Sequence, residues 1–203
     1  MEQHIQEPES RRQSMIPFAA SISRYSEWLR ALITEGAEIP FPAGAGKELA
    51  RTQIAGGLVL SVPVAGGASI LKRRNCEDAL LSDHGRWQDV HLGALRAAYG
   101  KTPYFPHLYP EIERIYQSFG GGRLRDFNEE IHRLVAGWLG IEEGMIEELR
   151  NLPEEKRRVI SALAEERKGE IEEDHSILEL LFRLGREGLF VLVGDFVLPH
   201  STR

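Results

Sequence analysis

Trp87-Gln-Asp-Val-His91-Leu-Gly-Ala-Leu95-Arg-Ala-Ala-Tyr99 is the stretch of the chain that decides most about its fold. Trp87, His91, Leu95 and Tyr99 recur at every fourth position. Each such step turns an α-helix by about 400°, so the four side chains form one slowly drifting stripe. The spacing predicts a helix over residues 86–100. Its stripe, an imidazole between two large aromatic rings, is either a seam of the hydrophobic core or the wall of a binding site.

The overall composition predicts one globular domain with a small accessory lobe. The chain has 203 residues, of which 42% are hydrophobic and 28% charged, and this suffices for one sizeable core. A net charge of −6 argues against a nucleic-acid-binding protein, which usually carries a basic face. A small-molecule substrate such as a nucleotide-sugar, or a protein partner, fits the charge better. The sequence is also compatible with a homo-oligomer.

Cysteine use and apolar runs predict where the protein works. Cys76 is the only cysteine, so no disulfide can form within the chain, and a cytoplasmic location is expected. Residues 1–13 are polar, lack the apolar centre of a secretory signal, and are expected to form a disordered tail. The longest apolar run, residues 189–198, is interrupted by Gly194 and Asp195 and is about half as long as a membrane span. No membrane span is expected.

Strand signals lie in the N-terminal half of the chain. Leu58-Val-Leu-Ser-Val-Pro-Val64 is rich in β-branched residues and lies between two Gly-Gly pairs, which predicts a strand. Pro63 cannot donate to a ladder, so it should lie at an edge, a bulge or the strand end. We also expect short strands over residues 14–18 and 37–41, a mobile loop over 40–48, and pairing of residues 75–81 beside the main strand.

Helical spacing governs residues 22–33 and most of the chain after Arg86. Asp126-Phe-Asn-Glu129 has the spacing of a capping box and should begin a helix that ends at Gly140. Asn151-Leu-Pro153 should begin a charged surface helix.

The last helix should be strongly apolar, cover residues 177–184, end at Gly185 and dock on the core. Together the patterns predict an α/β fold, with a small mixed N-terminal sheet covered by helices and a predominantly helical C-terminal half. The expected division is a tail over 1–13, an α/β core over 14–120, and a helical region over 121–203 packed on that core.

Two common kinds of site fail a test of residue spacing. Gly44-Ala-Gly46-Lys47 resembles the end of a phosphate-binding P-loop, but Phe41 stands where the first glycine belongs, and Glu48 replaces the Ser or Thr. Metal-ligand residue types also occur, without the i, i+4 or short-loop spacing usual at zinc or iron centres. They are Asp83, His84, His91 and His107. We therefore expect neither a metal nor a cofactor.

His91 is the candidate catalytic residue, and two interpretations of it stay open. A histidine on an apolar stripe is usually buried, with one ring nitrogen bonded to a backbone carbonyl. Alternatively, His91 opens into a pocket and acts as an acid or base, with Asp83 or Asp89 orienting its ring.

In the catalytic alternative, other residues would contact the substrate. The aromatic faces of Trp87 and Tyr99 suit the C–H surface of a sugar ring. Lys47, Arg51 and Lys101 are candidates to bind a phosphate or carboxylate group.

Several short motifs occur in a defined order over about residues 50–185. They are Leu60-Ser-Val-Pro-Val64-Ala-Gly-Gly67, Ser82-Asp-His-Gly-Arg-Trp87, His91, Ala98-Tyr99, Thr102-Pro-Tyr-Phe105, Leu124-Arg-Asp-Phe-Asn128 and Ser176-Ile-Leu-Glu-Leu-Leu-Phe182. In this order they resemble the WbqC-like family. The resemblance implies a bacterial protein encoded among genes for O-antigen (lipopolysaccharide) or other surface polysaccharides. It also implies a biosynthetic transferase, with group transfer to an activated sugar.

The N-terminal half departs from the pattern of that family. A Gln-Pro-Tyr-Phe-Pro-like segment is Ile16-Pro-Phe-Ala-Ala-Ser-Ile22 here, and an Arg-Asn-Arg-like motif is reduced to Lys47 and Arg51. These changes favour the alternative of a non-catalytic binding or assembly protein of the same pathway. A concave pocket joining His91 to Lys47 or Arg51 would favour the enzyme. A fully buried His91 and an exposed apolar patch would favour the binding protein.

Overall fold

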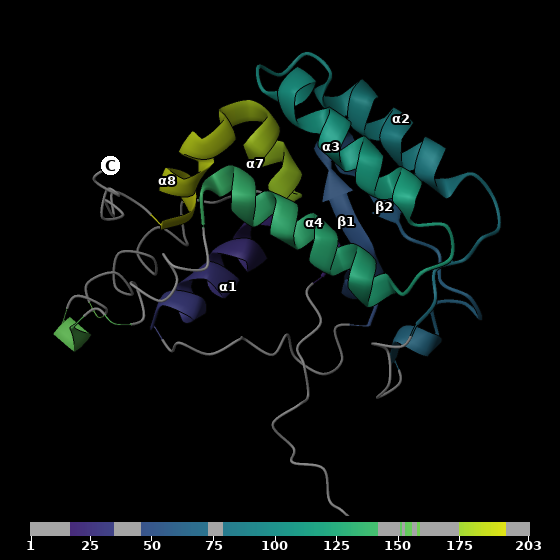
Figure 1. Ribbon diagram of the computed structural model, residues 1–203, viewed down its shortest axis with the longest axis horizontal. Helices are drawn as coiled ribbons and strands as arrows, with labels where there is room; N and C mark the ends of the chain where they lie inside the picture. Colours follow the sequence, from purple (N-terminus) through teal and green to yellow (C-terminus); the bar gives the residue numbers. More distant parts are fainter. Residues whose placement is uncertain are drawn as a thin grey trace, which may run out of the picture.

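The computed structural model describes residues 17–34, 46–72, 79–141, 151, 153–155, 158 and 175–193. In these ranges helices dominate, and a two-stranded sheet lies near the N-terminal end (Figure 1). The predicted α/β class, with a small N-terminal sheet and a mostly helical C-terminal half, is confirmed. Among the helices of the described ranges, none has the length and apolar character needed to cross a bilayer.

The sheet is an antiparallel hairpin of β1 (Arg51–Ile54) and β2 (Leu58–Ser61). Burial alternates along β1, with Thr52 and Ile54 facing the core, as expected for a half-exposed strand. The predicted strand is thus confirmed over residues 58–61, and Pro63 follows its end. The sheet differs from the predicted mixed sheet, since its pairing and the isolated bridges in the described ranges are all antiparallel.

Other strand predictions meet a mixed outcome. Of the segment 14–18, where a strand was expected, Pro17 has no regular secondary structure and Phe18 lies in a turn with Ala19. Residues 14–16, like residues 37–41, lie outside the described residues. Of the expected loop over 40–48, only residues 46–48 are described. Gly46 and Lys47 form a turn that leads into the short helix Glu48–Ala50. Leu81 does pair beside the main strand, in a single bridge to Val64.

The helices match the predictions closely. Those expected over 22–33, 86–100 and 177–184 are all present, and the last also ends at Gly185 as predicted. Ser176 begins that helix by accepting a hydrogen bond from the Leu178 N–H at 3.2 Å. The α-helices are α1 (Ile22–Thr34), α2 (Trp87–Tyr99), α3 (Phe105–Ser118), α4 (Leu124–Leu139), α7 (Ile177–Leu184) and α8 (Gly188–Val193).

The predicted capping box at the start of α4 is wrong. The helix begins at Leu124, after Arg123, which makes no side-chain cap. Asp126 therefore lies within the first turn, where its charge favours the helix dipole. Glu129 is held by Arg125 at 2.7 Å instead of reaching back to a cap. The predicted end is correct, because Gly140 adopts a left-handed conformation with φ of 73°.

The surface helix expected after residue 151 is described only at isolated positions. Glu154, Glu155 and Arg158 are helical and exposed, and Arg158 lies 2.5 Å from Glu154. The remaining residues of that segment lie outside the described ranges.

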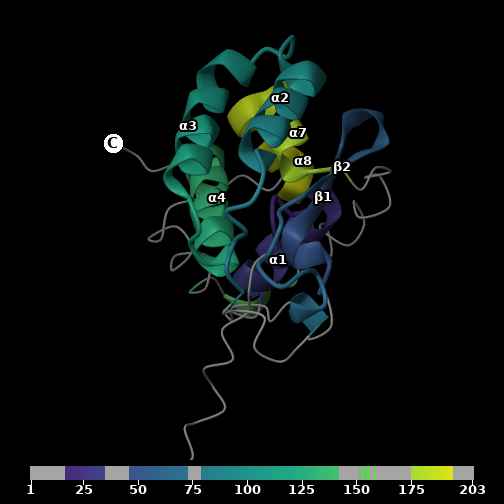
Figure 2. The same ribbon diagram turned by 90° about the vertical axis from the view of Figure 1, so that its right-hand side faces the viewer.

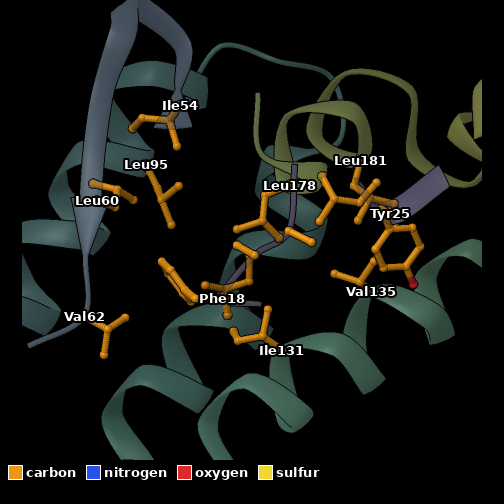
Figure 3. Close-up of a cluster of buried hydrophobic side chains, with 14 of the residues drawn as sticks. Phe18, Tyr25, Ile54, Leu60, Val62, Leu95, Ile131, Val135, Leu178 and Leu181 are labelled. Carbon is orange, nitrogen blue, oxygen red and sulfur yellow. The ribbon is translucent and has the colours of Figure 1, made fainter. Parts of the chain in front are cut away.

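Helix α7 joins parts of the chain that are distant in sequence. It packs against α1, α3 and α4, and Figure 2 shows the hairpin on the side of the molecule away from α3 and α4. Figure 3 shows the core where these elements meet, with residues from the hairpin, α2, α4 and α7 around Phe18. The α7 contacts cross the expected boundary at residue 120, and the domain division itself stays a prediction.

Replacement of Gly185 by alanine should destabilise the fold. Gly185 has φ of +57°, and an added Cβ would lie 2.6 Å from the Tyr104 ring. We expect a loss of about 1–3 kcal/mol in the free energy of unfolding, measured with chemical denaturant. Gly56→Ala is the control, because Gly56 has φ of +79° but open space around it, and backbone strain alone costs about 1 kcal/mol. Equal losses in both variants would rule out the contact with Tyr104 as the cause.

Candidate functional site

The stripe on α2 is buried along its whole length. Trp87 is 8% exposed, His91 3%, and Leu95 and Tyr99 0%. The four residues therefore line the core instead of an open surface.

His91 lies in an aromatic cluster and uses both ring nitrogens. Nε2 is 3.2 Å from the Ser61 carbonyl oxygen, and Nδ1 is 3.3 Å from the Tyr116 hydroxyl. A carbonyl only accepts, so Nε2 carries the proton and Nδ1 accepts from Tyr116. The ring also stacks on Phe18 and meets Trp87 edge-on. These contacts match the core alternative for His91, and its catalytic role stays a prediction.

Burial lowers the pKa of His91 to about 4, while the hydrogen bond to Ser61 acts in the opposite direction. The imidazole is therefore neutral at pH 7. A neutral ring with one donating and one accepting nitrogen fits the two partners that it has.

The carboxylates considered as partners of His91 face other groups. Asp83 is exposed and lies 3.7 Å from His84, and Asp89 accepts a hydrogen bond from Arg86 at 2.7 Å. The structure therefore places both carboxylates in surface contacts, whereas the two ring contacts of His91 are to Ser61 and Tyr116.

The three candidate cations are all on the surface. Lys47 precedes the hairpin and Lys101 follows α2, and both are exposed. Arg51 is exposed on the outer face of β1, opposite the face that carries Thr52 and Ile54. Since His91 lies in the core, the structure does not bring these cations to its ring.

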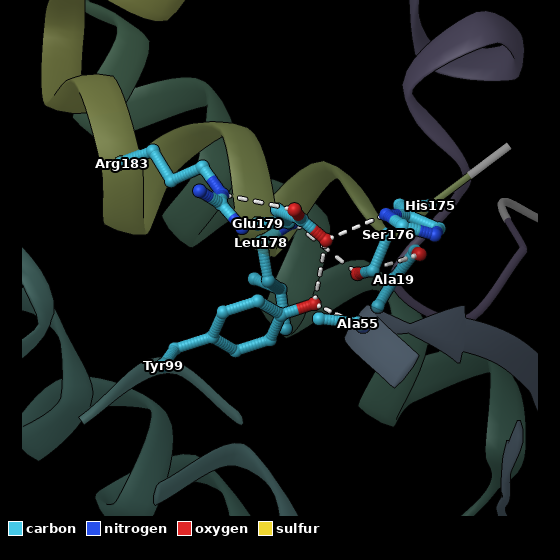
Figure 4. A network of polar contacts seen from close by, with 8 residues as sticks. All are labelled: Ala19, Ala55, Tyr99, His175, Ser176, Leu178, Glu179 and Arg183. Carbon is cyan, nitrogen blue, oxygen red and sulfur yellow. Dashed lines mark hydrogen bonds and ion pairs between the residues drawn. The ribbon is translucent and has the colours of Figure 1, made fainter. Parts of the chain in front are cut away.

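A second polar cluster, which the sequence did not predict, surrounds Glu179 (Figure 4). The Tyr99 hydroxyl donates to Glu179 Oε2 at 2.9 Å, and Arg183 Nε donates to Oε1 at 2.9 Å. His175 Nδ1 lies 2.8 Å from Oε2. Glu179 itself is only 6% exposed. We call Tyr99, His175, Glu179 and Arg183 the Glu179 cluster.

Helical spacing positions two members of this cluster, because Glu179 and Arg183 lie four residues apart on one side of α7. His175 also lies four residues from Glu179 in sequence, but it precedes the helix, since Ser176 has a non-helical ψ of 140°. Glu179 is the single charged residue between Ile177 and Phe182. A lone acid in an apolar run, with a histidine and an arginine four residues to either side, was the signal that could have revealed the cluster.

Tyr99 links the cluster to the hairpin. Its hydroxyl accepts a hydrogen bond from the Ala55 N–H at 2.9 Å while it donates to Glu179. Burial raises the pKa of Tyr99, and the negative charge of Glu179 raises it further. The phenol therefore stays protonated and remains a donor to the carboxylate.

A strained turn lies beside the cluster. Ala19 has φ of +37°, which is uncommon for a residue with a Cβ. Its carbonyl accepts a hydrogen bond from Ser176 Oγ at 3.2 Å (Figure 4). It accepts a second from Thr52 Oγ1 at 2.8 Å. These two hydroxyls from distant elements hold the turn in place next to His175.

The Glu179 cluster has the parts of an acid–base centre. A carboxylate beside an imidazole can orient the ring and stabilise its protonated form. A buried carboxylate without partners would be strongly unfavourable, and here a phenol, an imidazole and a guanidinium compensate it. Within the described ranges, no three His, Cys, Asp or Glu side chains gather as a metal site would require.

The profile of the WbqC-like protein family matches residues 49–185, more than half of the chain. The chain belongs to the WbqC-like protein family. The match includes His91 and every member of the Glu179 cluster, and it leaves out the divergent segment over residues 16–22. No curated protein and no solved structure matches this WbqC-like chain.

Acid should destabilise the protein through two histidines, the buried His91 and the half-buried His132. Burial lowers the pKa of His91 to about 4, and burial with a lesser effect of Arg133 does the same for His132. Unfolded histidine has a pKa of about 6.5, so below pH 6.5 the unfolded chain binds protons that the folded chain does not. The stability from the neutral rings is complete above pH 6.5 and is lost as the pH falls toward 4.

Between pH 7 and pH 5 we expect each histidine to lower the free energy of unfolding by on the order of 1–2 kcal/mol. His132→Phe keeps an aromatic ring against Trp28, which His132 meets edge-on at 4.3 Å, and should flatten the pH dependence. Denaturant titrations at several pH values measure the free energy of unfolding of wild type and variant. If the free energy of unfolding of His132→Phe depends on pH as steeply as that of wild type, His132 does not contribute to the loss of stability in acid.

His91→Asn separates the two interpretations of that residue. Because the ring is buried and bonded at both nitrogens, we expect a loss of about 2 kcal/mol in unfolding free energy. Asp83→Asn, at an exposed position, should change stability by less than about 0.5 kcal/mol. An undisturbed melting temperature in His91→Asn, combined with lost activity, would instead support the catalytic interpretation.

Proposed function

We propose that this WbqC-like chain is a cytoplasmic enzyme of surface-polysaccharide biosynthesis that transfers a group to an activated sugar. The motifs shared with the WbqC-like family support the pathway and the reaction class. The Glu179 cluster supports the chemistry, because group transfer to a sugar hydroxyl or amine requires removal of a proton.

The observation that carries the proposal is the short contact between His175 and Glu179. Glu179 Oε2 lies 2.8 Å from Nδ1 of the ring, and we assign the proton exchange with the substrate to the His175 imidazole. In the proposed step the sugar hydroxyl or amine attacks the transferable group of an activated donor. The new bond forms as the bond to the leaving group breaks with its electron pair. His175 takes the proton and returns it to the leaving group.

Each of the other cluster members has a separate part in this proposal. Glu179 orients the ring of His175 and stabilises the imidazolium that forms. Tyr99, first considered as a contact to a sugar ring, is proposed to position Glu179 through its hydrogen bond of 2.9 Å. The catalytic assignment of His91 and Asp83, and the substrate contacts of Trp87, Lys47, Arg51 and Lys101, stay predictions.

Conservative variants of the cluster test the proposal. Donors and acceptors are first found by thermal shift with nucleotide-sugars and acyl-coenzyme A compounds, and transfer is then followed by mass spectrometry. His175→Asn and Glu179→Gln should each lower the rate about 100-fold or more, because each removes acid–base function.

Glu113→Gln is the matched control. Glu113 also binds an arginine and a tyrosine, Arg96 and Tyr109, each at 3.3 Å, but on the α2–α3 surface. It should leave the transfer rate unchanged. Transfer at the wild-type rate by folded His175→Asn would contradict the proposal, and melting temperatures identify variants that have lost the fold.

A second candidate is a non-catalytic binding protein of the same pathway. Two observations favour it: His91 is 3% exposed, and Leu58 and Val59 are each 51% exposed at the hairpin. In this case Leu58→Ser with Val59→Ser should abolish function in the source organism, whereas Glu179→Gln should retain it. The opposite pattern supports the enzyme.

A further inference from the structure

Solvent reaches the Glu179 cluster on the side of Arg183. The exposed fraction of the side chain is 8% for Glu179, 16% for His175 and 56% for Arg183. A ligand that reaches the buried carboxylate and imidazole from this side would meet Arg183 at the surface.

Arg183 uses only part of its hydrogen-bonding capacity. Its Nε donates to Glu179 at 2.9 Å, and its two terminal nitrogens make no hydrogen bond or ion pair to a described residue. Each terminal nitrogen carries two N–H groups in the plane of the guanidinium. Such a planar fork matches the paired oxygens of a phosphate or carboxylate.

The contact with Glu179 prepares the guanidinium for a ligand. A free arginine side chain loses considerable rotamer freedom when it is fixed, but here Nε is already held at a buried carboxylate. That carboxylate is also shared with Tyr99 and His175, so its charge is compensated by several groups and not by Arg183 alone. The terminal nitrogens thus retain attraction for an anion.

We infer that the Glu179 cluster binds an anionic sugar, with the phosphate or carboxylate of that sugar on the terminal nitrogens of Arg183. This inference rests on the proposed function, since it places the sugar that accepts the group next to His175. The anion would hold the sugar while the imidazole removes a proton from its reacting group.

Calorimetric titration of the full chain tests the inference with three probes: UDP-glucose for a phosphate, glucuronate for a carboxylate, and neutral glucose. Wild type should bind at least one of the two anionic probes more tightly than glucose. Arg183→Gln should weaken that binding about tenfold or more, because it removes charged hydrogen bonds. Arg183→Lys keeps the positive charge but not the planar pair of terminal nitrogens, so its affinity for that probe should lie between those of wild type and Arg183→Gln. The probe that loses affinity identifies the anion.

Arg133→Gln is the matched control. Arg133 is 68% exposed and also pairs with a glutamate on its own helix, Glu130, so its replacement should leave binding unchanged. Wild-type affinity in Arg183→Gln, an equal loss for glucose, or no binding of either anionic probe to wild type would overturn the inference.

The test also separates this inference from the proposed function. If anion binding depends on Arg183 but no group transfer is detected, the proposed enzyme function is wrong and the anion site is retained. Transfer that depends on His175 and Glu179 but not on Arg183 would refute the anion site and leave the enzyme.

Discussion

The hydrogen bond from Tyr99 to Glu179 joins residues 80 positions apart and brings together three elements of the fold. Tyr99 ends α2, Glu179 lies in α7, and the same hydroxyl accepts from Ala55 in the hairpin turn. A carboxylate that is 6% exposed must be compensated wherever it lies. Because its partners come from different elements, this requirement also fixes how α7 lies against the rest of the chain.

The aromatic cluster around His91 is the second centre of the core. Phe18, Trp87 and Tyr116 contact the ring, and Phe127 packs against these three aromatic residues. His91 also connects α2 to the hairpin through the Ser61 carbonyl. One stripe on α2 therefore has two functions along its length. Its first half packs aromatic rings in the interior, and its last residue, Tyr99, reaches a polar cluster of which Arg183 is exposed to solvent.

The local elements could be predicted well because their signals are local. Helix α7 was expected over its full length, since an apolar run and a terminal glycine lie within nine residues. The start of α4 was misplaced because Glu129 pairs with Arg125, and a spacing rule does not show which of two nearby partners a carboxylate takes. Strand β1 was missed because it is short and carries polar residues on its outer face.

The site could be predicted only in part. Tyr99 was selected for its place on the stripe, but its partners in α7 and the hairpin became visible only in three dimensions. Asp83 was close to His91 in sequence, yet it lies on the surface beside His84. Sequence separation is a poor guide to which charged groups meet once helices pack.

By itself, the sequence determined the fold class, most helix boundaries and the family, because these depend on periodicity, caps and motifs that neighbouring residues carry. The tertiary structure alone decided which polar side chains are buried together. For a histidine on an apolar stripe and for a glutamate in an apolar helix, the sequence does not show which partners satisfy the buried polar group. Only the packing of distant elements supplies the answer: a carbonyl and a hydroxyl for His91, and a phenol, an imidazole and a guanidinium for Glu179.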